Sequence, residues 1–342
     1  MPTSDRIVVL APNWLGDAVM ALPAFADVRR HFSEAHVAVA ARPGVAPIFT
    51  MVDGVDEVIT FPGGGGWRAL TGWASDAQAL SAGSFDTAIL LPNSFATAWI
   101  ASQAGIAERW GYATDWRGSM LTRAVPKPRG EVHQRAYYQA LTTALGIDAG
   151  PPYARVRPDT AKARQLLKDI GLDVDEPFVV FAPGAAYGRA KQWLPERFAE
   201  LADQLINQRG WSVVMVGSTV DRSACEEIAR RLPKTGTRMN RLIDFCGKSD
   251  LATLAGVLSQ ATAVVSNDSG AMHLAGAVGT KVIAVFGPTN EARTSPLSAG
   301  ADAPAPVVIT HDVFCRPCML RECPIDHRCM RRITAREVLQ AI

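Results

Sequence analysis

Residues 263–277 read Ala-Val-Val-Ser-Asn-Asp-Ser-Gly-Ala-Met-His-Leu-Ala-Gly-Ala. The stretch begins with a short aliphatic run, Ala263–Ser266, which has the length and composition of a buried β-strand. A polar turn with a glycine follows, and the small and aliphatic residues of Ala271–Ala277 are typical of a helix. A strand, a turn and a helix in this order form one βα unit, the repeating element of a mostly parallel sheet.

The same alternation recurs along the chain and predicts an α/β fold. The expected strands are Ile7–Ala11, His36–Ala40, Val58–Phe61, Thr87–Leu91, Arg109–Gly111, Phe178–Ala182, Ser212–Val216, Leu242–Phe245, Ala263–Ser266, Val282–Phe286 and Val307–Thr310. The expected helices are Leu15–His31, Trp67–Ser81, Phe95–Ala104, Glu131–Leu145, Pro195–Gln208, Asp221–Arg231, Asp250–Ser259, Ala271–Ala277 and Thr334–Ala341.

A segment rich in Gly and Pro, Gly146–Pro158, separates the two halves of this pattern. At 342 residues the chain is long enough for two domains. We predict two Rossmann-like domains, 1–155 and 156–330, followed by a C-terminal helix in 331–342. Two such folds in tandem predict a cleft to which each sheet presents the carboxyl ends of its strands, and ligands are expected there.

The charge balance narrows the class of partner. The sequence has 35 Lys and Arg against 33 Asp and Glu, so no bulk positive field marks a nucleic-acid binder. The start of the chain carries only a short apolar run, Ile7–Pro12, without the hydrophobic region of a signal peptide. No stretch approaches the roughly 18 uninterrupted apolar residues of a membrane-spanning helix. We therefore expect a cytoplasmic protein that touches a membrane only peripherally and has no nucleic-acid partner.

The first loop of interest, Asn13-Trp14-Leu15-Gly16-Asp17, follows the first expected strand and opens a helix. Gly16 allows a tight turn or a close approach to a ligand, and Asp17 is expected at the carboxyl edge of the first sheet. Asp17 can be a functional carboxylate of a ligand site, or it can merely stabilise the helix by interacting with the positive end of its dipole. The spacing leaves both alternatives open. The loop has no Gly-x-Gly-x-x-Gly, which argues against a dinucleotide site in this domain.

The second loop, Ala182–Pro195, follows the first strand of the second half and reads Ala-Pro-Gly-Ala-Ala-Tyr-Gly-Arg-Ala-Lys-Gln-Trp-Leu-Pro. Its small residues let backbone amides face a phosphate, and Arg189 and Lys191 add positive charge just before a helix. The alternative is a solvated loop with incidental charges. Because such sheets bind ligands at the carboxyl ends of their strands, a pyrophosphate site is the favoured interpretation.

The third loop is the turn within Ser266–Ala275. Ser269, Gly270 and Ala271 place free amides and a hydroxyl at a helix N-terminus, which suits an anion. His273 lies one helical turn further on, where it can donate to a phosphate oxygen. A single His in an apolar helix is more often a packed core residue, so this alternative stays open.

Together the three loops resemble the motifs of glycosyltransferase family 9, the ADP-heptose transferases of lipopolysaccharide core synthesis. Asn13–Asp17, followed by Ala21–Ala24, is similar to the opening motif of the family. Pro183-Gly184 with Lys191–Pro195 resembles its phosphate loop, and Asn267–Ala275 resembles its donor-site motif. The resemblance spans nearly the whole chain, with the motifs in the family's order and spacing.

The resemblance implies a GT-B architecture, with ADP-heptose held mainly by the second domain and the acceptor by the first. It implies an inverting reaction without a catalytic metal or a cofactor. Asp17 would be the general base, Lys191 a partner of the donor phosphates, and Asp268 a contact of the donor heptose. The remaining donor-site residues would be Gly184, Ser269, Gly270, Ala271 and His273, and the acceptor-side residues Asn13, Gly16 and Arg117. The family often carries Thr or Ser where Ala186 and Tyr187 stand here, and it holds ribose and adenine at the places of Gly217-Ser218-Thr219 and Gly247-Lys248.

The implied reaction moves L-glycero-D-manno-heptose to the first heptose of heptosyl-Kdo2-lipid A. This acceptor is rich in carboxylates and phosphates, and a local excess of basic residues in the first domain would suit it, although a solvated surface explains the excess almost as well. Heptosyltransferase I, another GT-B nucleotide-sugar transferase and a binding protein without turnover are the alternatives. The basic residues are Arg109, Arg117, Arg123, Lys127, Arg129 and Arg135.

Four of the six cysteines lie between Cys315 and Cys329, a pattern that does not suggest a secreted disulfide scaffold. The tail with Cys323-Pro324 and His327–Met330 resembles the branch of the family called heptosyltransferase II. Cys315-x2-Cys318 has the spacing of metal ligands. Because a second Cys-x2-Cys is lacking, a loop of reduced, packed thiols is slightly favoured. We predict no catalytic metal, and the sequence leaves open whether the thiols bind one.

Overall fold

The computed structural model describes residues 5–63, 69–232 and 239–342. The chain divides into two compact units, Met1–Ala154 and Arg155–Ile342, and the division falls inside the Gly- and Pro-rich segment. The start of the helix expected at Trp67 lies outside the described residues. In the part of the chain that the structure describes, no helix is both long and apolar enough to cross a membrane.

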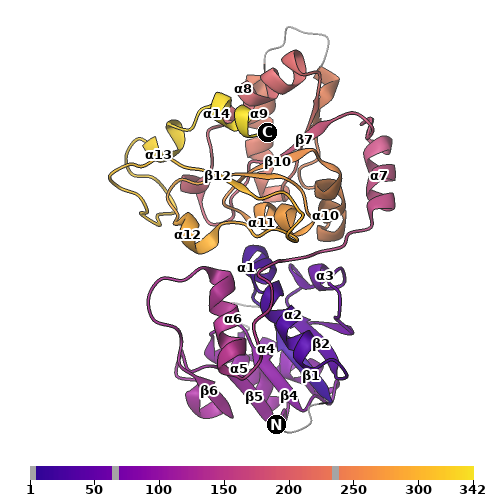
Figure 1. Cartoon of the computed structure of the whole chain (residues 1–342), viewed down its shortest axis with the longest axis vertical. Coiled ribbons are helices and arrows are strands. Elements are labelled where there is room, and N and C mark those ends of the chain that lie inside the picture. Colours follow the sequence, from indigo (N-terminus) through magenta and orange to yellow (C-terminus); the bar gives the residue numbers. More distant parts are fainter. Residues whose placement is uncertain (1–4, 64–68, 233–238) are drawn as a thin grey trace. The chain divides into compact units, whose positions relative to one another are not determined.

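In the described residues of the first unit, six parallel strands form one sheet in the order β3-β2-β1-β4-β5-β6 (Figure 1). The strands are β1 (Arg6–Leu10), β2 (His36–Ala41), β3 (Glu57–Thr60), β4 (Thr87–Leu90), β5 (Glu108–Tyr112) and β6 (Arg123–Val125). The helices are α1 (Leu15–Met20), α2 (Leu22–His31), α3 (Ala46–Phe49), α4 (Ala69–Ser81), α5 (Phe95–Gln103) and α6 (Gln134–Ala144), with a 3-10 turn η2 (Gly118–Met120).

The first sheet is covered on both faces, as expected when parallel strands are joined by helices. Val8 and Leu10 point to the face that α4 and α5 cover, and they share a core cluster with Leu80. Successive residues of a strand point to opposite faces, so Ile7 and Val9 point to the other side. All four residues are at most 2% exposed. The paired helices α2 and α6 lie on that other side.

The prediction of one helix over Leu15–His31 is wrong, because the structure has two. α1 ends at Met20, and α2 begins at Leu22 with Pro23 in its first turn. A proline has no N–H to donate, and its ring clashes with the carbonyl four residues earlier in a continuous helix. Pro23 is therefore accepted only where a new helix starts. The short α1 keeps Asp17 in a first turn of its own.

In the described residues of the second unit, six parallel strands form a sheet in the order β12-β11-β10-β7-β8-β9. The strands are β7 (Phe178–Ala182), β8 (Ser212–Met215), β9 (Leu242–Asp244), β10 (Ala263–Asn267), β11 (Val282–Val285) and β12 (Val307–Ile309). The helices are α7 (Thr160–Asp169), α8 (Pro195–Asp203), α9 (Arg222–Arg231), α10 (Leu251–Gln260), α11 (Gly270–Ala277), α12 (Glu291–Thr294), α13 (Arg328–Arg331) and α14 (Ala335–Ala341). Short turns η3 (Arg189–Lys191), η5 (Thr219–Asp221) and η6 (Met239–Arg241) and the π-helical η4 (Gln204–Gln208) complete it.

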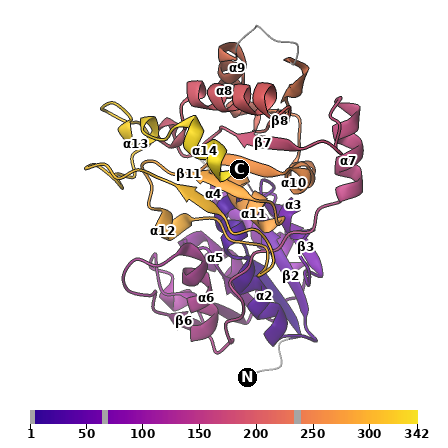
Figure 2. The same cartoon turned by 45° about the horizontal axis from the view of Figure 1, so that its top comes forward.

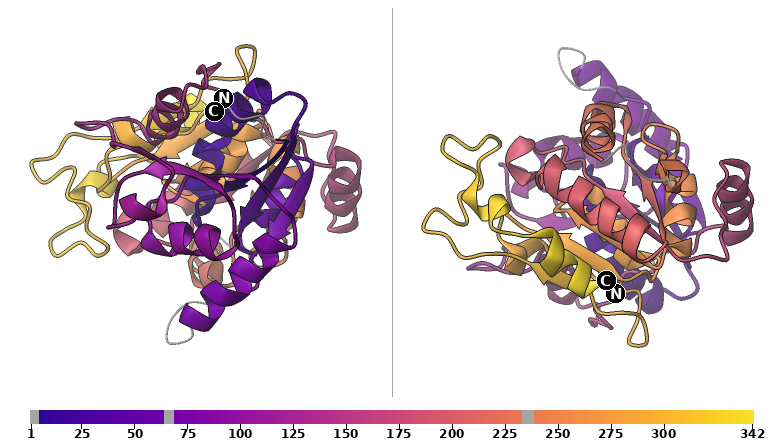
Figure 3. Two further views of the ribbon diagram at one scale, coloured as in Figure 1. Left: turned by 90° about the horizontal axis from the view of Figure 1, so that it is seen from below. Right: turned by 90° about the horizontal axis from the view of Figure 1, so that it is seen from above.

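Helices also cover the second sheet. α8 and α9 pack side by side (Figure 2), and Phe198 and Ile228 place them in one core with alternate residues of the strands. The C-terminal helix α14 lies along α8 (Figure 3) and adds Val338 to the same core, so it belongs to the second unit. A capping box between Thr334 and Glu337 fixes its start.

The strand orders place two pairs of loops where ligands bind in folds of this kind. In each sheet the chain starts at a central strand, builds toward one edge, and then crosses to the other side of that strand. These reversals lie between β1 and β4 in the first unit and between β7 and β10 in the second. Loops at the carboxyl ends of such neighbouring strands diverge and leave room for a ligand. All three loops singled out in the sequence follow one of these strands.

Candidate functional site

In the second unit, the two loops with anion-binding features lie at the same edge of the sheet. β7 and β10 pair in parallel, with Ala182 opposite Ser266, so Pro183 and Asn267 leave the sheet together. β11 pairs with β10 on its other side and carries the chain to Thr289 at the same edge. Three segments far apart in the sequence thus converge.

A buried ion pair connects these segments. Lys191 Nζ lies 2.6 Å from Asp268 Oδ2, and the two side chains are only 14% and 6% exposed. The same carboxylate oxygen accepts a hydrogen bond of 2.8 Å from the Thr289 hydroxyl. The Lys191 ammonium also lies 4.8 Å from the centre of the Tyr187 ring, close enough for a cation-π contact. Lys191 and Asp268, both predicted to contact the donor, are therefore in direct contact with each other.

Asn267 holds the two loops in register. Its Oδ1 accepts from the Trp193 backbone N–H at 2.8 Å, and its Nδ2 donates to the Pro183 carbonyl at 2.7 Å. The residue is 0% exposed. One buried amide thus fixes the chain at both ends of the segment that carries Lys191.

We expect Asn267→Ala to lower the free energy of unfolding by about 2 kcal/mol or more, because buried groups at Trp193 and Pro183 both lose their partner. The measurement is chemical denaturation of the second unit within the full chain. Asn207→Ala is the control, since its exposed amide donates to Asp203, one turn earlier in the same helical stretch. Equal, small losses in both variants would contradict the bracing role.

The first turn of α11 brings the remaining predicted donor residues together. The N-cap Ser269 makes no side-chain bond to the helix, and its hydroxyl lies 3.0 Å from the Ser266 hydroxyl instead. The first backbone N–H groups of α11, which include those of Gly270 and Ala271, are therefore not capped by the Ser269 side chain and can donate to another acceptor. His273 is 3% exposed, on the buried side of α11.

Gly184 allows the phosphate loop to approach the loop after β8. A Cβ atom at Gly184 would lie 2.2 Å from Asp221 Oδ1, so a larger residue would displace this carboxylate. Asp221 Oδ2 in turn accepts from the Ser218 N–H and hydroxyl at 2.8 and 2.7 Å. Gly247 N–H donates to the Gly217 carbonyl at 2.8 Å. The places expected for ribose and adenine are thus adjacent to Gly184.

In the first unit, the loop after β1 leads directly into α1. Asn13 and Trp14 are exposed, whereas Gly16 and Asp17 are partly buried in the first turn of the helix. α1 and α6 are in contact, and burial, followed by the Asp17 charge, raises the pKa of the Tyr138 hydroxyl on α6. Because this loop leaves the carboxyl end of β1, Asp17 lies at the expected edge of the sheet.

Arg117 is buried rather than on the surface. Its side chain donates to the backbone carbonyls of Tyr112 and Ser94 at 3.0 and 3.2 Å and to the Thr97 hydroxyl at 3.0 Å. It is 0% exposed, and burial lowers the pKa of its guanidinium to about 10. In this position it joins the loops after β4 and β5.

Other basic residues of the same stretch are also engaged locally. Arg109 donates to the Met120 carbonyl at 2.7 Å, and the Arg123 guanidinium lies 4.4 Å from the Trp110 ring centre. Lys127 and Arg129 remain exposed to solvent. The excess of positive charge read from the sequence is thus available to an anionic ligand mainly at these two residues.

Sequence reasoning missed two contributors to the donor loops. Thr289 was not considered, although it follows a strand that ends at the same edge. Tyr187 stands where the family often carries Thr or Ser, and its hydroxyl donates to the Met319 carbonyl at 2.8 Å. Its ring lies under both Lys191 and Arg321. Both residues follow strands that end at this edge of the sheet, and only the strand order places Thr289 there.

The cysteines fall into two groups. Cys225 and Cys246 are joined by a disulfide in the core of the second unit, which the sequence analysis did not anticipate. With Asp244 they are the one group of metal-type side chains within the described ranges whose ligand atoms lie mutually within 4.8 Å. Cys315, Cys318, Cys323 and Cys329 are free thiols.

Comparisons with known proteins define the class of the fold. Residues 73–327 match the sequence profile described as "Glycosyltransferase family 9 (heptosyltransferase)". The chain is 33% identical over 308 residues to lipooligosaccharide heptosyltransferase 2 of Haemophilus influenzae, covering 86% of both chains. It is 30% identical over 302 residues to lipopolysaccharide heptosyltransferase 2 of Escherichia coli, again with 86% of both chains covered. The solved structure of E. coli ADP-heptose lps heptosyltransferase II superposes with a TM-score of 0.82 at 26% identity, over 98% of this chain and 97% of that one.

The prediction of two Rossmann-like units of the GT-B class is therefore confirmed, and the chain is a glycosyltransferase. It belongs to glycosyltransferase family 9, as the three loop motifs indicated.

Proposed function

We propose that this chain transfers L-glycero-D-manno-heptose from ADP-heptose to the first heptose of heptosyl-Kdo2-lipid A, with inversion at the anomeric carbon. The observation that carries the proposal is the contact of Lys191, Asp268 and Thr289 beside the N-terminus of α11, in a member of family 9. The names of the two relatives, both heptosyltransferases 2, favour this acceptor over the one that lacks a heptose.

The donor side of the proposal follows from charge. As the bond to ADP breaks, the diphosphate gains negative charge, which Lys191 and the amides of the first α11 turn can stabilise. Lys191 bonds Asp268 in the present structure. When a diphosphate competes for the ammonium, the Asp268 carboxylate becomes available to accept from a heptose hydroxyl. Gly184, Ser269, Gly270, Ala271 and His273 complete the donor side.

The acceptor side of the proposal lies in the first unit. Asp17 accepts the proton of the attacking hydroxyl, since a carboxylate within hydrogen-bond reach can act as a general base. One base and one face of attack give inversion, so no carboxylate nucleophile and no catalytic metal are needed. Asn13 and Gly16 border Asp17, and Arg117 contributes by holding the neighbouring loops. Lys127 and Arg129 suit the anionic groups of the acceptor.

The place of action follows from the acceptor. Because the acceptor is anchored by lipid A, we assign the enzyme to the cytoplasm, where it meets the inner face of the inner membrane peripherally. No nucleic acid and no cofactor take part in this reaction.

A turnover assay with ADP-heptose and acceptors carrying zero or one heptose tests the proposal. We expect transfer to the acceptor with one heptose and little to the acceptor with none. Preference for the latter would indicate heptosyltransferase I. UDP- and GDP-sugars serve as donor controls. If calorimetry detected no ADP binding, the second unit would not be a donor site, and a binding protein without turnover would be favoured.

ADP should also protect the second unit. Any ligand that binds only the folded state raises the free energy of unfolding, by about 2.7 kcal/mol at 100 times Kd. We therefore expect ADP to raise the unfolding midpoint of the chain and to slow proteolysis within residues 155–342. Protection confined to residues 5–154 would contradict the assignment of the donor.

A further inference from the structure

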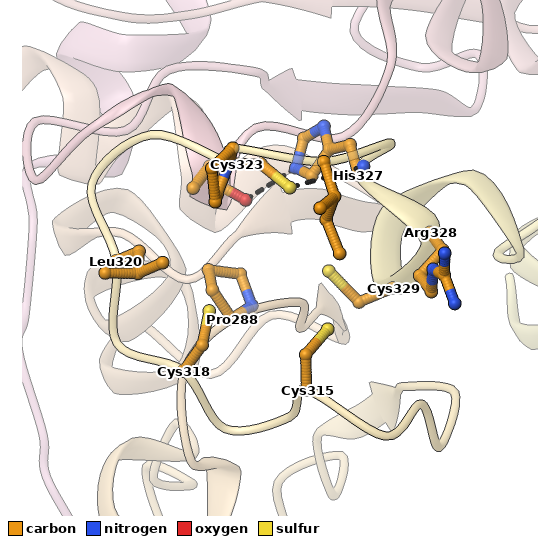
Figure 4. A pocket seen from close by; sticks show the side chains of 11 residues that line it. Pro288, Cys315, Cys318, Leu320, Cys323, His327, Arg328 and Cys329 are labelled. Carbon is orange, nitrogen blue, oxygen red and sulfur yellow. Dashed lines mark hydrogen bonds between the residues drawn. The ribbon is translucent and has the colours of Figure 1, made fainter.

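The four free cysteines line one small pocket that the proposed reaction does not use. Cys315, Cys318, Cys323 and Cys329 all border it (Figure 4), and its volume is about 70 Å³. They come from two stretches that enclose the pocket, with Cys315 and Cys318 on one and the later pair on the other. Their sequence spacing is Cys-x2-Cys-x4-Cys-x5-Cys.

The segment that carries these thiols is held by hydrogen bonds to neighbouring loops rather than by regular secondary structure. Between β12 and α13 it has turns and bends but neither helix nor strand. Two of its large apolar residues face solvent rather than a core: Phe314 is 80% exposed, and Ile325 is 54% exposed. A loop without a core of its own is commonly fixed by a disulfide or a metal ion. The four thiols are free here, so a metal ion is the cross-link that remains open to them.

Two groups at the pocket, the His327 backbone N–H and Arg328, would favour bound thiolates. The His327 backbone N–H donates to Cys323 Sγ at 3.3 Å, a bond that favours the charged form of the sulfur. Four thiolates around a divalent ion carry two excess negative charges, and Arg328 lines the same pocket. His327 Nε2–H donates to the Ala190 carbonyl at 2.7 Å, which fixes the ring.

We propose that Cys315, Cys318, Cys323 and Cys329 bind one thiolate-preferring metal ion, Zn²⁺ or Fe²⁺, at a structural site. Four sulfur ligands in tetrahedral geometry select these ions over Mg²⁺ or Ca²⁺. Binding displaces the thiol protons into solvent. As the loop lies here, no three of the sulfurs are mutually within 4.8 Å. Since Zn–S bonds are about 2.3 Å long, the ion would draw the two stretches together.

This metal would brace the donor loops without entering the chemistry. Ala190 N–H donates to the Arg321 carbonyl at 2.9 Å, and the Tyr187 hydroxyl donates to the Met319 carbonyl at 2.8 Å. A Cβ at Gly188 would lie 2.4 Å from the same Arg321 carbonyl, so the two segments are in close contact. The turn η3, which carries Lys191, is therefore in direct contact with the cysteine segment between β12 and α13.

Elemental analysis of untagged full-length chain, purified without chelator, tests the proposal directly. We expect about one equivalent of zinc or iron per chain, since four-thiolate structural sites hold one ion. Cys315→Ser and Cys318→Ser should each lose most of it. The matched control, Cys225→Ala with Cys246→Ala, removes the other cysteine pair and should keep the metal. Metal lost in the control but kept in the Cys315 and Cys318 variants would overturn the assignment.

Cobalt provides a second readout that does not depend on activity. Chain prepared under reducing, metal-free conditions and given Co²⁺ should show the intense visible absorption of a tetrahedral thiolate complex. Cys318→Ser, whose exposed side chain is the least needed for packing, should lose that absorption while its circular dichroism stays unchanged. A wild-type chain that holds no metal and gives no such spectrum would refute the site. The outcome is independent of ADP binding, so it is separable from the proposed function.

Discussion

Asp17→Asn should abolish most heptose transfer, lowering turnover by roughly the 10²- to 10⁴-fold that a lost general base costs. Asparagine keeps the size of the side chain and can still accept bonds at a helix N-terminus, but it cannot take a proton at neutral pH. Folding and ADP affinity should therefore stay close to wild type. The loss should appear in kcat with saturating acceptor and donor, because the step affected follows binding.

Asp159→Asn is a matched control for this variant. Asp159 caps α7 by accepting from the Lys162 N–H at 3.0 Å, so it has the structural role without the proposed chemical one. We expect full turnover from it. If Asp17→Asn also kept near-normal turnover with intact folding, Asp17 would be only a helix-terminal acid, and Asp268 would be the next residue to test.

The strands were predictable where a short apolar run is bounded by turn residues. Phe178–Ala182 is such a run, and β7 has the same ends as predicted. β6, Arg123–Val125, was not predicted, because three residues with one buried side chain are too few to show the alternation of a strand. α7 was missed because its buried stripe is only Ala163 and Leu167. A narrow stripe among charged residues does not separate a helix from a solvated loop.

The site was predictable to the level of loops, because a parallel sheet forces the ends of neighbouring strands together. Lys191 and Asp268 are 77 residues apart, yet both follow central strands, and they meet at 2.6 Å. What the sequence could not reveal is the surroundings of each side chain. Arg117 counts as a surface charge in a composition argument, whereas only the fold shows that its guanidinium is enclosed by backbone carbonyls. Thr289 became visible only through the order of the strands.

The disulfide illustrates the same limit. Cys225 lies in α9 and Cys246 follows β9, 21 positions further along the chain. Nothing in that spacing indicates a pair. Their contact depends on α9 packing onto the sheet beside β8 and β9, which is tertiary information. The four clustered thiols, in contrast, are recognisable from spacing alone, and the structure adds that they surround one pocket.

Lys191→Met should weaken ADP binding by roughly 10- to 100-fold, because a charge-assisted hydrogen bond contributes about 1.5–3 kcal/mol. The same change should also destabilise the second unit, since it leaves the Asp268 carboxylate buried without a cation, with the Thr289 hydroxyl as its hydrogen-bond donor. In the single variant, weaker ADP binding can therefore result from the lost ammonium or from the lower stability of the unit. A double-mutant cycle with Asp268→Asn separates them.

In the double variant, both charges of the buried pair are gone. Since much of the cost of breaking such a pair is the unpaired charge that remains, the free energy of unfolding should largely recover. ADP affinity should not recover, because the ammonium that meets the diphosphate is still missing. Calorimetry with ADP and denaturation of the same three variants measure the two quantities. If affinity returned together with stability, Lys191 would serve only to neutralise Asp268, and the diphosphate would rely on the amides of the first α11 turn.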